Sequence, residues 1–244
     1  MTTTLYGIPA SHPVFAAELM LAAKGVPYRR LDLPQVIHMP LMRALRFPAA
    51  TVPALVIDGR RIQTTRAIAR ALEELRRDPP LLPADPERRA RVEEIEAWCD
   101  GDFQQLDRRI IYWALLRHHE AVPSYFEGAR VLMPRALIKP LAPPVIRVAA
   151  KIQGSVDDAV RADLAALPGL LDRIDGWIAE GLLGGEEPNV ADYQVASTLA
   201  LLMTLDDLRP LISPRPAGEL VRRHAAGYPG RMPPTFPKAW LPVT

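Results

Sequence analysis

Residues 51–65 read TVPALVIDGRRIQTT, and this stretch decides the fold. Residues 54–57 are apolar, Asp58-Gly59 suits a tight two-residue turn, and residues 60–63 can run back, so the stretch predicts a β-hairpin. Pro53 stands where the first strand begins and cannot donate a ladder hydrogen bond. Either proline is simply tolerated as the first residue of a strand, or a cis peptide between Val52 and Pro53 exposes the Val52 backbone to a ligand.

The segments around the hairpin show apolar residues in alternation or at helical spacing. They predict strands at 3–8 and 28–33 and helices at 13–24, 36–45 and 65–75. This order of elements is typical of a compact α/β unit with one parallel crossover and one antiparallel hairpin. We therefore expect an α/β domain over residues 1–77.

A proline-rich segment at 78–86 is the clearest domain boundary in the chain. Every periodic segment after it is helical, which predicts an all-α domain over residues 87–244. Its expected helices cover 88–119, 156–182 with a break near Pro168-Gly169, 189–205 and 219–226. Five prolines between 123 and 144 predict an irregular stretch, and the proline-rich tail from Tyr228 should be extended. The fold class is therefore α/β plus all-α.

The bulk composition excludes several classes of protein. The chain has 244 residues and a net charge of +2, which is too small to favour nucleic acid as a partner. One cysteine, Cys99, allows neither an internal disulfide nor a cysteine-based metal site, and we expect it to be buried and inert. The start of the sequence lacks a signal-peptide pattern, and no segment is apolar enough to span a membrane, so we expect a cytoplasmic protein.

Three motifs in this order resemble the glutathione S-transferase family. Residues 51–55 (TVPAL) are similar to its V-P-x-L segment, residues 64–68 (TTRAI) to its E-S-x-A-I segment, and residues 189–192 (NVAD) to the capping box of its helical domain. The linker at 82–86 (LPADP) is similar as well. The resemblance implies a thioredoxin-like N-terminal domain, of a bacterial tau- or omega-like kind, followed by the family's helical domain. It also implies a cis peptide at Pro53.

The resemblance implies a glutathione site in the N-terminal domain. Ser11 falls on the position that activates the thiol in tau-like members, where its hydroxyl would donate to the thiolate; the alternative is that Ser11 only caps the helix. His12 would assist as a neighbouring donor, or it is a partly exposed loop residue. Val52, next to Pro53, would bind the cysteinyl backbone, and Thr64 and Thr65 would hold the γ-glutamyl group.

Two departures from the family pattern bear on activity. Thr64 replaces a glutamate, so the γ-glutamyl ammonium group would need another partner, such as Asp100 or Asp102 of the partner subunit. Ala16 replaces an arginine that tau-like members carry. His38, Arg43 or Arg46 would meet the glycyl carboxylate, although a solvated surface role is the alternative for each.

The acceptor pocket should lie between the two domains. Apolar and aromatic residues repeat along the helix expected at 88–119, either as pocket lining or as plain core. The candidates are Phe103, Leu106, Arg109, Ile110, Tyr112 and Trp113. His118-His119 are expected to be surface residues, because neighbouring positions on a helix diverge.

We therefore expect a homodimeric enzyme that conjugates glutathione, or a related thiol, to a small electrophile without a metal ion. The alternative is a non-catalytic protein of the same fold that binds a ligand or serves as a scaffold. A third hypothesis is a membrane-attached helper protein, because residues 135–151 are basic and apolar. Since their prolines should prevent one regular amphipathic helix, we do not expect membrane contact.

Overall fold

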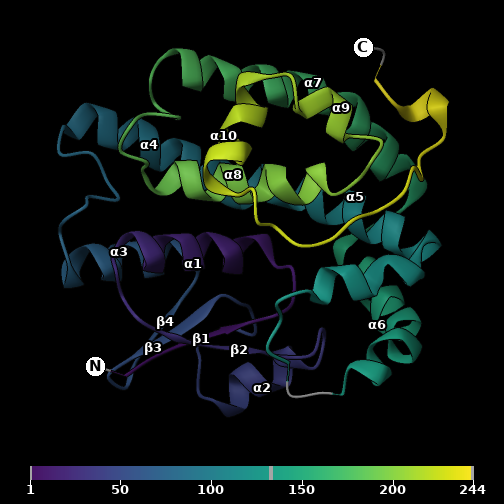
Figure 1. The fold of residues 1–244 in the computed structure, drawn as a ribbon, viewed down its shortest axis with the longest axis horizontal. Coiled ribbons are helices and arrows are strands. Elements are labelled where there is room, and N and C mark those ends of the chain that lie inside the picture. Colours follow the sequence, from purple (N-terminus) through teal and green to yellow (C-terminus); the bar gives the residue numbers. More distant parts are fainter. Residues whose placement is uncertain (1, 132–133, 243–244) are drawn as a thin grey trace.

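The computed structural model describes residues 2–131 and 134–242, and it contains a mixed four-stranded sheet beside a helical domain (Figure 1). The strands are β1 (Thr3–Gly7), β2 (Arg29–Asp32), β3 (Ala54–Ile57) and β4 (Arg60–Gln63), in the order β2-β1-β3-β4. β1 pairs in parallel with β2 and antiparallel with β3. In the β3–β4 hairpin Ile57 pairs with Arg60, so Asp58 and Gly59 form the predicted two-residue turn.

Helices cover both faces of this sheet. α1 (His12–Ala23) and α3 (Thr65–Leu75) lie on the face toward the helical domain, and α2 (His38–Ala44) lies on the opposite face (Figure 1). The peptide bond between Val52 and Pro53 is cis, as the resemblance implied. The N-terminal domain therefore has the thioredoxin-like arrangement that the sequence predicted.

The second domain is helical, as predicted. Its α-helices are α4 (Pro86–Trp98), α5 (Gln104–Arg117), α6 (Ile138–Gln153), α7 (Asp157–Ala179), α8 (Val190–Met203), α9 (Arg209–Ile212) and α10 (Pro216–His224). Short 3₁₀ segments lie at His119–Phe126, Arg135–Leu137 and Lys238–Trp240. α8 is buried from Val190 to Leu202 and packs against α1, so one apolar core runs through both domains.

The helix expected at 88–119 contains one irregularity. A π-helical turn, η1 (Cys99–Phe103), joins α4 to α5 without a break in the helical path. A π turn adds a residue to the helical repeat and so rotates the faces of α5 relative to those of α4. Cys99 lies at this junction and is fully buried, as expected.

Two predictions made from proline were wrong. α7 continues through Pro168, and α6 is one helix although it contains Pro140, Pro143 and Pro144. Pro140 stands in the first turn of α6, where a missing N–H has no helical partner to lose. The other prolines do remove backbone hydrogen bonds, but both helices bury an apolar face, and such packing supplies most of a helix's stability in a protein.

The start of α8 shows the capping box predicted from residues 189–192. The side-chain oxygen of Asn189 accepts hydrogen bonds from the backbone N–H of Ala191 (2.9 Å) and Asp192 (3.4 Å). In return, the Asp192 carboxylate accepts from the Asn189 N–H at 2.8 Å. The Asn189 amide also donates to the buried carbonyl of Leu182 at 2.9 Å, so one side chain serves both the helix and the preceding turn.

The tail from Tyr228 is extended except for its 3₁₀ turn and runs back across the helical domain (Figure 1). Its last two residues, 243–244, lie outside the described residues. Within residues 2–131 and 134–242, none of the helices has the length and apolar character needed to cross a membrane.

We predict that Asn189→Ala lowers the free energy of unfolding by about 1–2 kcal/mol, because it removes a buried cap and leaves the Leu182 carbonyl without a donor. Asp85 is the matched control, since it caps α4 through one bond to the Arg88 N–H in an exposed position. Asp85→Ala should cost about 0.5–1 kcal/mol. Urea denaturation of the three proteins measures both values; equal losses would contradict the role given to Asn189.

We predict that Cys99 does not react with a thiol reagent in the folded protein. Burial raises the pKa of its thiol to about 12, so the reactive thiolate is absent near neutral pH. A colorimetric thiol titration should find one reactive group in urea and none in buffer. Rapid labelling of the native protein would show that the α4–α5 junction opens.

Candidate functional site

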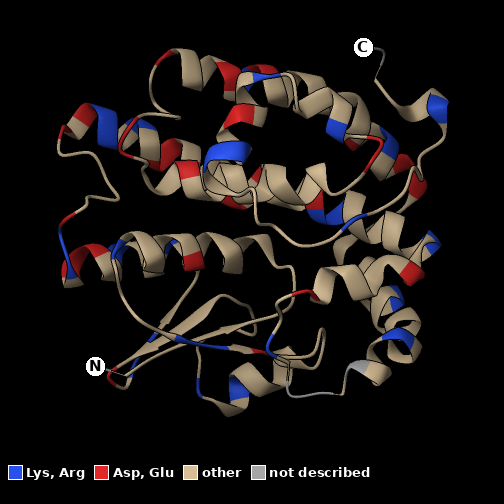
Figure 2. Cartoon of the chain, viewed as in Figure 1, with Lys and Arg blue, Asp and Glu red and all other residues tan. Residues whose placement is uncertain are grey.

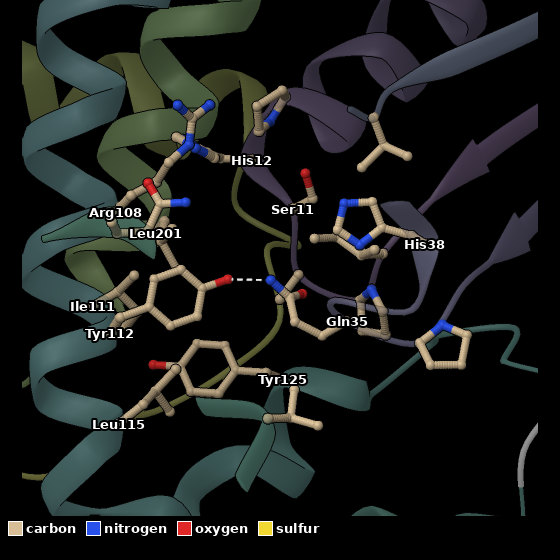
Figure 3. A pocket seen from close by; sticks show the side chains of 18 of the residues that line it. Ser11, His12, Gln35, His38, Arg108, Ile111, Tyr112, Leu115, Tyr125 and Leu201 are labelled. Atoms are coloured by element: carbon tan, nitrogen blue, oxygen red, sulfur yellow. Dashed lines mark hydrogen bonds between the residues drawn. The ribbon is translucent and has the colours of Figure 1, made fainter. Parts of the chain in front are cut away.

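A cavity of about 540 Å³ lies between the two domains. The side of the N-terminal domain contributes Ser11, His12, His38, Val52, Pro53, Thr64 and Thr65, together with Gln35. The facing wall consists of Asp100, Gln104, Arg108, Ile111, Tyr112 and Leu115, with further apolar residues from α6. Figure 3 shows Ser11, Gln35 and His38 on one side of the cavity and Arg108, Ile111 and Tyr112 on the other. The structure thus brings seven of the predicted N-terminal residues to one place, and Arg43 and Arg46 are the exceptions.

Ser11 directly precedes α1 and has the extended backbone of an N-cap residue (φ −79°, ψ 114°). Its carbonyl accepts the first helical hydrogen bond from the Phe15 N–H at 2.9 Å, but its side chain makes no capping bond. The interpretation of Ser11 as a plain side-chain cap is therefore wrong. The hydroxyl lies in the cavity lining at the positive end of the α1 dipole, where a negative ligand atom is favoured.

The C-terminal tail holds the turn that carries Ser11. The Tyr228 hydroxyl donates to the carbonyl of Ala10, a non-glycine residue with φ of +48°. The Tyr228 ring packs edge-on against Phe15 on α1, with 5.0 Å between ring centroids. This turn therefore depends on contacts from the far end of the chain.

His12 is not the partly exposed loop residue that the sequence suggested. It is the first residue of α1 and is 3% exposed. Its Nδ1 lies 3.0 Å from a carboxylate oxygen of Asp107 on α5 and 3.3 Å from the Thr198 hydroxyl on α8. Burial lowers the pKa of His12 although Asp107 opposes this shift, and burial likewise raises the pKa of Asp107. The two side chains thus form a buried polar contact between the domains.

Thr64 and Thr65 mark the start of α3. Thr64 has φ of +79° and ψ of 147°, a region that β-branched residues rarely adopt, and its hydroxyl accepts from the Ala67 N–H at 3.2 Å. Its own N–H donates to the Pro53 carbonyl at 3.3 Å, so the two motifs are directly linked. Thr65 is 1% exposed, and its buried hydroxyl has no partner among the described residues. The helix start can therefore bind a carboxylate with N–H groups and this hydroxyl.

The segment before Val52 is held by one side chain. The Gln63 amide group donates to the carbonyls of Ala49 (2.8 Å) and Thr51 (2.6 Å), and its oxygen accepts from the Ala49 N–H at 2.8 Å. This bridge from β4 fixes the backbone that presents Val52 to the cavity. Sequence reasoning missed Gln63, because glutamine is a residue that is seldom buried.

Of the three cations considered for a glycyl carboxylate, only His38 reaches the cavity lining. His38 lies half-buried at the start of α2, and burial lowers its pKa, so it is neutral near neutral pH. Arg43 and Arg46 are exposed and lie outside the lining.

Phe103 and Ile110, the proposed acceptor-pocket residues, are fully buried in the core and do not line the cavity. The lining face of α5 is the neighbouring one, with Gln104, Arg108, Ile111 and Tyr112 at helical spacing. Of the six helix candidates only Tyr112 is found there; Gln35 donates to its hydroxyl at 2.5 Å and so bridges the cavity from the N-terminal domain (Figure 3). Burial raises the pKa of Tyr112 to about 12.

Two acidic residues were considered as partners of an ammonium group. Asp100 lines the cavity of its own chain, whereas Asp102 is exposed outside the lining. Among residues 2–131 and 134–242, no group of three or more histidine, cysteine or acidic side chains is placed to hold a metal ion.

Residues 5–80 match the family model described as "Glutathione S-transferase, N-terminal domain". A probable maleylacetoacetate isomerase of Caenorhabditis elegans is 35% identical over 104 residues, which are 42% of this chain and 48% of that protein. The chain thus spans about half of that relative's length. FtsZ-localized protein A of Caulobacter vibrioides is 27% identical over 84% of this chain and 79% of its own.

Solved structures extend the likeness to the whole chain. The theta class glutathione S-transferase of Xanthomonas axonopodis pv. citri, crystallised with glutathione bound, has a TM-score of 0.58 at 20% identity. The match covers 92% of this chain and 97% of that one. At this identity the likeness concerns the fold. Residues 5–80 are thus a glutathione S-transferase N-terminal domain, and the chain as a whole has the glutathione S-transferase fold.

Proposed function

We propose that this protein is a glutathione transferase that binds glutathione against its N-terminal domain and adds the thiol to a small electrophile. One observation carries the proposal: Ser11, Val52, Thr64 and Thr65 line one interdomain cavity, and the Ser11 hydroxyl makes no bond to its own helix. The glutathione-bound structural relative supports the choice of thiol.

The three parts of glutathione match three parts of the cavity. The γ-glutamyl carboxylate would bind at the start of α3, where the Thr65 hydroxyl lies buried and unpaired among the described residues. Asp100 lines the same cavity and is suited to the ammonium group in place of the glutamate that Thr64 replaces. The Val52 backbone would pair with the cysteinyl unit, and His38 would lie near the glycyl end.

Ser11 would favour the thiolate by donating its O–H to the sulfur. An unperturbed thiol has a pKa of about 8.5, so a donor and the α1 dipole together raise the fraction of nucleophile near neutral pH. The thiol proton passes to solvent, the sulfur forms a bond to the electrophilic carbon, and the leaving group departs with its electron pair. The apolar wall from α5 and α6 would hold the electrophile.

Isomerisation is a second reaction that the same thiolate can perform. Addition to a conjugated double bond, rotation about the resulting single bond and elimination of the thiol return an isomer without net consumption of glutathione. The maleylacetoacetate isomerase relatives motivate this assay, since they match the chain at 35% identity or more, although over half of their length or less.

A non-catalytic binding or scaffolding protein of the same fold is the alternative function. Thr64 and Ala16 depart from the tau-like pattern, and FtsZ-localized protein A, whose match covers 84% of this chain, is named for its localisation with FtsZ rather than for a reaction. Under either function, we propose a homodimer in the cytoplasm.

We predict that Ser11→Ala lowers kcat/KM for a chloronitrobenzene electrophile by about 10–100-fold near neutral pH, because the thiolate loses a donor. The pH profile of kcat/KM should shift upward by about 1–2 units, which a purely structural change would not cause. Ser213→Ala, a change outside the cavity lining, is the matched control. An unchanged profile in Ser11→Ala would contradict thiol activation by this hydroxyl.

We predict that Thr65→Val weakens glutathione binding by about tenfold, since the isosteric side chain keeps the volume but cannot donate to the γ-glutamyl carboxylate. Titration calorimetry measures the affinity, and Ser11→Ala should leave it nearly unchanged because that residue acts on the sulfur. If the wild-type protein binds no glutathione at millimolar concentrations, the enzyme proposal fails and the binding protein remains.

A further inference from the structure

Helix α6 carries an apolar stripe that no other part of the described chain covers. One side of the helix is buried, through Ile138, Ala142, Ile146 and Ala149. The neighbouring side leaves Leu141, Val148 and Ile152 exposed by 45%, 46% and 56%, and exposed aliphatic residues continue with Leu137 (45%) before the helix and Val156 (61%) after it. Exposed aliphatic side chains gathered in this way mark an interaction surface.

The same region has only positive charges. Residues 128–156 contain Arg130, Arg135, Lys139, Arg147 and Lys151 but neither aspartate nor glutamate. Lys139, Arg147 and Lys151 are exposed and form no ion pair with any residue in the described ranges 2–131 and 134–242. Figure 2 shows the contrast with α4, which carries both basic and acidic residues. This surface therefore fits a partner that is negatively charged.

The spacing of these residues places charge beside the stripe. At 100° per residue, Lys151 projects about 60° and Arg147 about 100° from Val148, both on the same edge of the apolar stripe. Leu141, within the stripe, also lines the interdomain cavity. The order around the helix is thus cations, exposed aliphatic residues and the residues that line the cavity, among them Val145 and Ile146.

We propose that α6 docks the protein on the surface of an anionic lipid bilayer, with Val148 and Ile152 inserted at the headgroup boundary and Arg147 and Lys151 on lipid phosphates. This combination of an apolar stripe and a basic edge is what an interfacial helix requires. The prolines do not prevent it, because α6 is one continuous helix. Docking in this way would bring the cavity mouth to the interface.

A second copy of the chain fits this surface less well. A twofold contact through α6 places the same patch on both sides, so Arg147 and Lys151 of one copy would face a surface with the same positive charges and no acidic residue. An anionic bilayer has the complementary charge and accepts aliphatic side chains without a shaped groove.

Vesicle co-sedimentation of the full chain tests the proposal. We expect the protein to bind vesicles of phosphatidylcholine with about one-third phosphatidylglycerol and not vesicles of phosphatidylcholine alone. Binding should weaken when salt rises from about 0.1 M to about 0.5 M, because the phosphate contacts are screened.

Two double variants separate the contribution of the positive charges from that of the apolar side chains. Arg147→Gln with Lys151→Gln should weaken binding about twenty- to thirtyfold, at about fivefold per cation, and reduce the salt dependence. Val148→Ser with Ile152→Ser should weaken binding as well but keep the salt dependence. Arg29→Gln with Arg77→Gln removes the same charge from exposed sites on the N-terminal domain and should have little effect.

The readout does not depend on catalysis, and none of the substituted residues lines the cavity, so conjugation of a soluble electrophile should be unchanged. Failure to bind anionic vesicles, or equal binding to neutral ones, would overturn the proposal. So would a dimer in analytical ultracentrifugation that Val148→Ser with Ile152→Ser dissociates, because the stripe would then be the contact between copies.

Discussion

A buried polar contact between the two domains fixes the turn on which the candidate site depends. His12 on α1 lies against Asp107 on α5 and Thr198 on α8, and all three side chains are almost completely buried. Polar groups removed from water are costly unless they pair with each other, so the contact is favourable only in one arrangement of the domains. Since Ser11 is the neighbour of His12, this arrangement also sets the distance from its hydroxyl to the wall formed by α5.

A second buried group fixes α3 in the same way. Glu96 on α4 is fully buried and pairs with Arg66 and Arg70 of α3, at 3.3 and 2.6 Å, while the amide of Gln194 on α8 donates to it at 2.9 Å. The helix whose first residue is Thr65 is thereby held against the helical domain. The starts of α1 and α3, which both face the cavity, are thus positioned by polar contacts across the domain boundary. Hydrogen bonds and ion pairs require a definite geometry, so they fix the positions of these two helix starts more closely than apolar packing alone would.

Features encoded by neighbouring residues could be predicted from the sequence. Asp58-Gly59 and the Asn189–Asp192 capping box each act within a few residues, and the structure has both, whereas the cis bond at Pro53 followed from the resemblance and not from its neighbours. The α/β domain followed by a helical one also follows from local periodicity. Features set by packing could not be predicted. His12 looks like a loop residue in the sequence because its partner, the Asp107 carboxylate, lies far away in the chain on α5. The prolines of α6 suggest breaks in the sequence because the packing of this helix against α5 cannot be seen there.

The acceptor pocket expected on α5 shows why an apolar pattern in the sequence identifies core residues rather than residues of a binding site. Phe103 and Ile110 were selected because they are apolar, and for that reason they are fully buried. The residues facing the cavity include the polar Asp100, Gln104 and Arg108 beside the apolar Ile111 and Leu115, so an apolar repeat alone does not identify them. The π turn at Cys99–Phe103 rotates this face relative to α4, so a helical repeat extended from α4 points to the wrong side. A search for polar residues four apart, interrupting an otherwise buried helix, is the sequence signal that identifies such a wall.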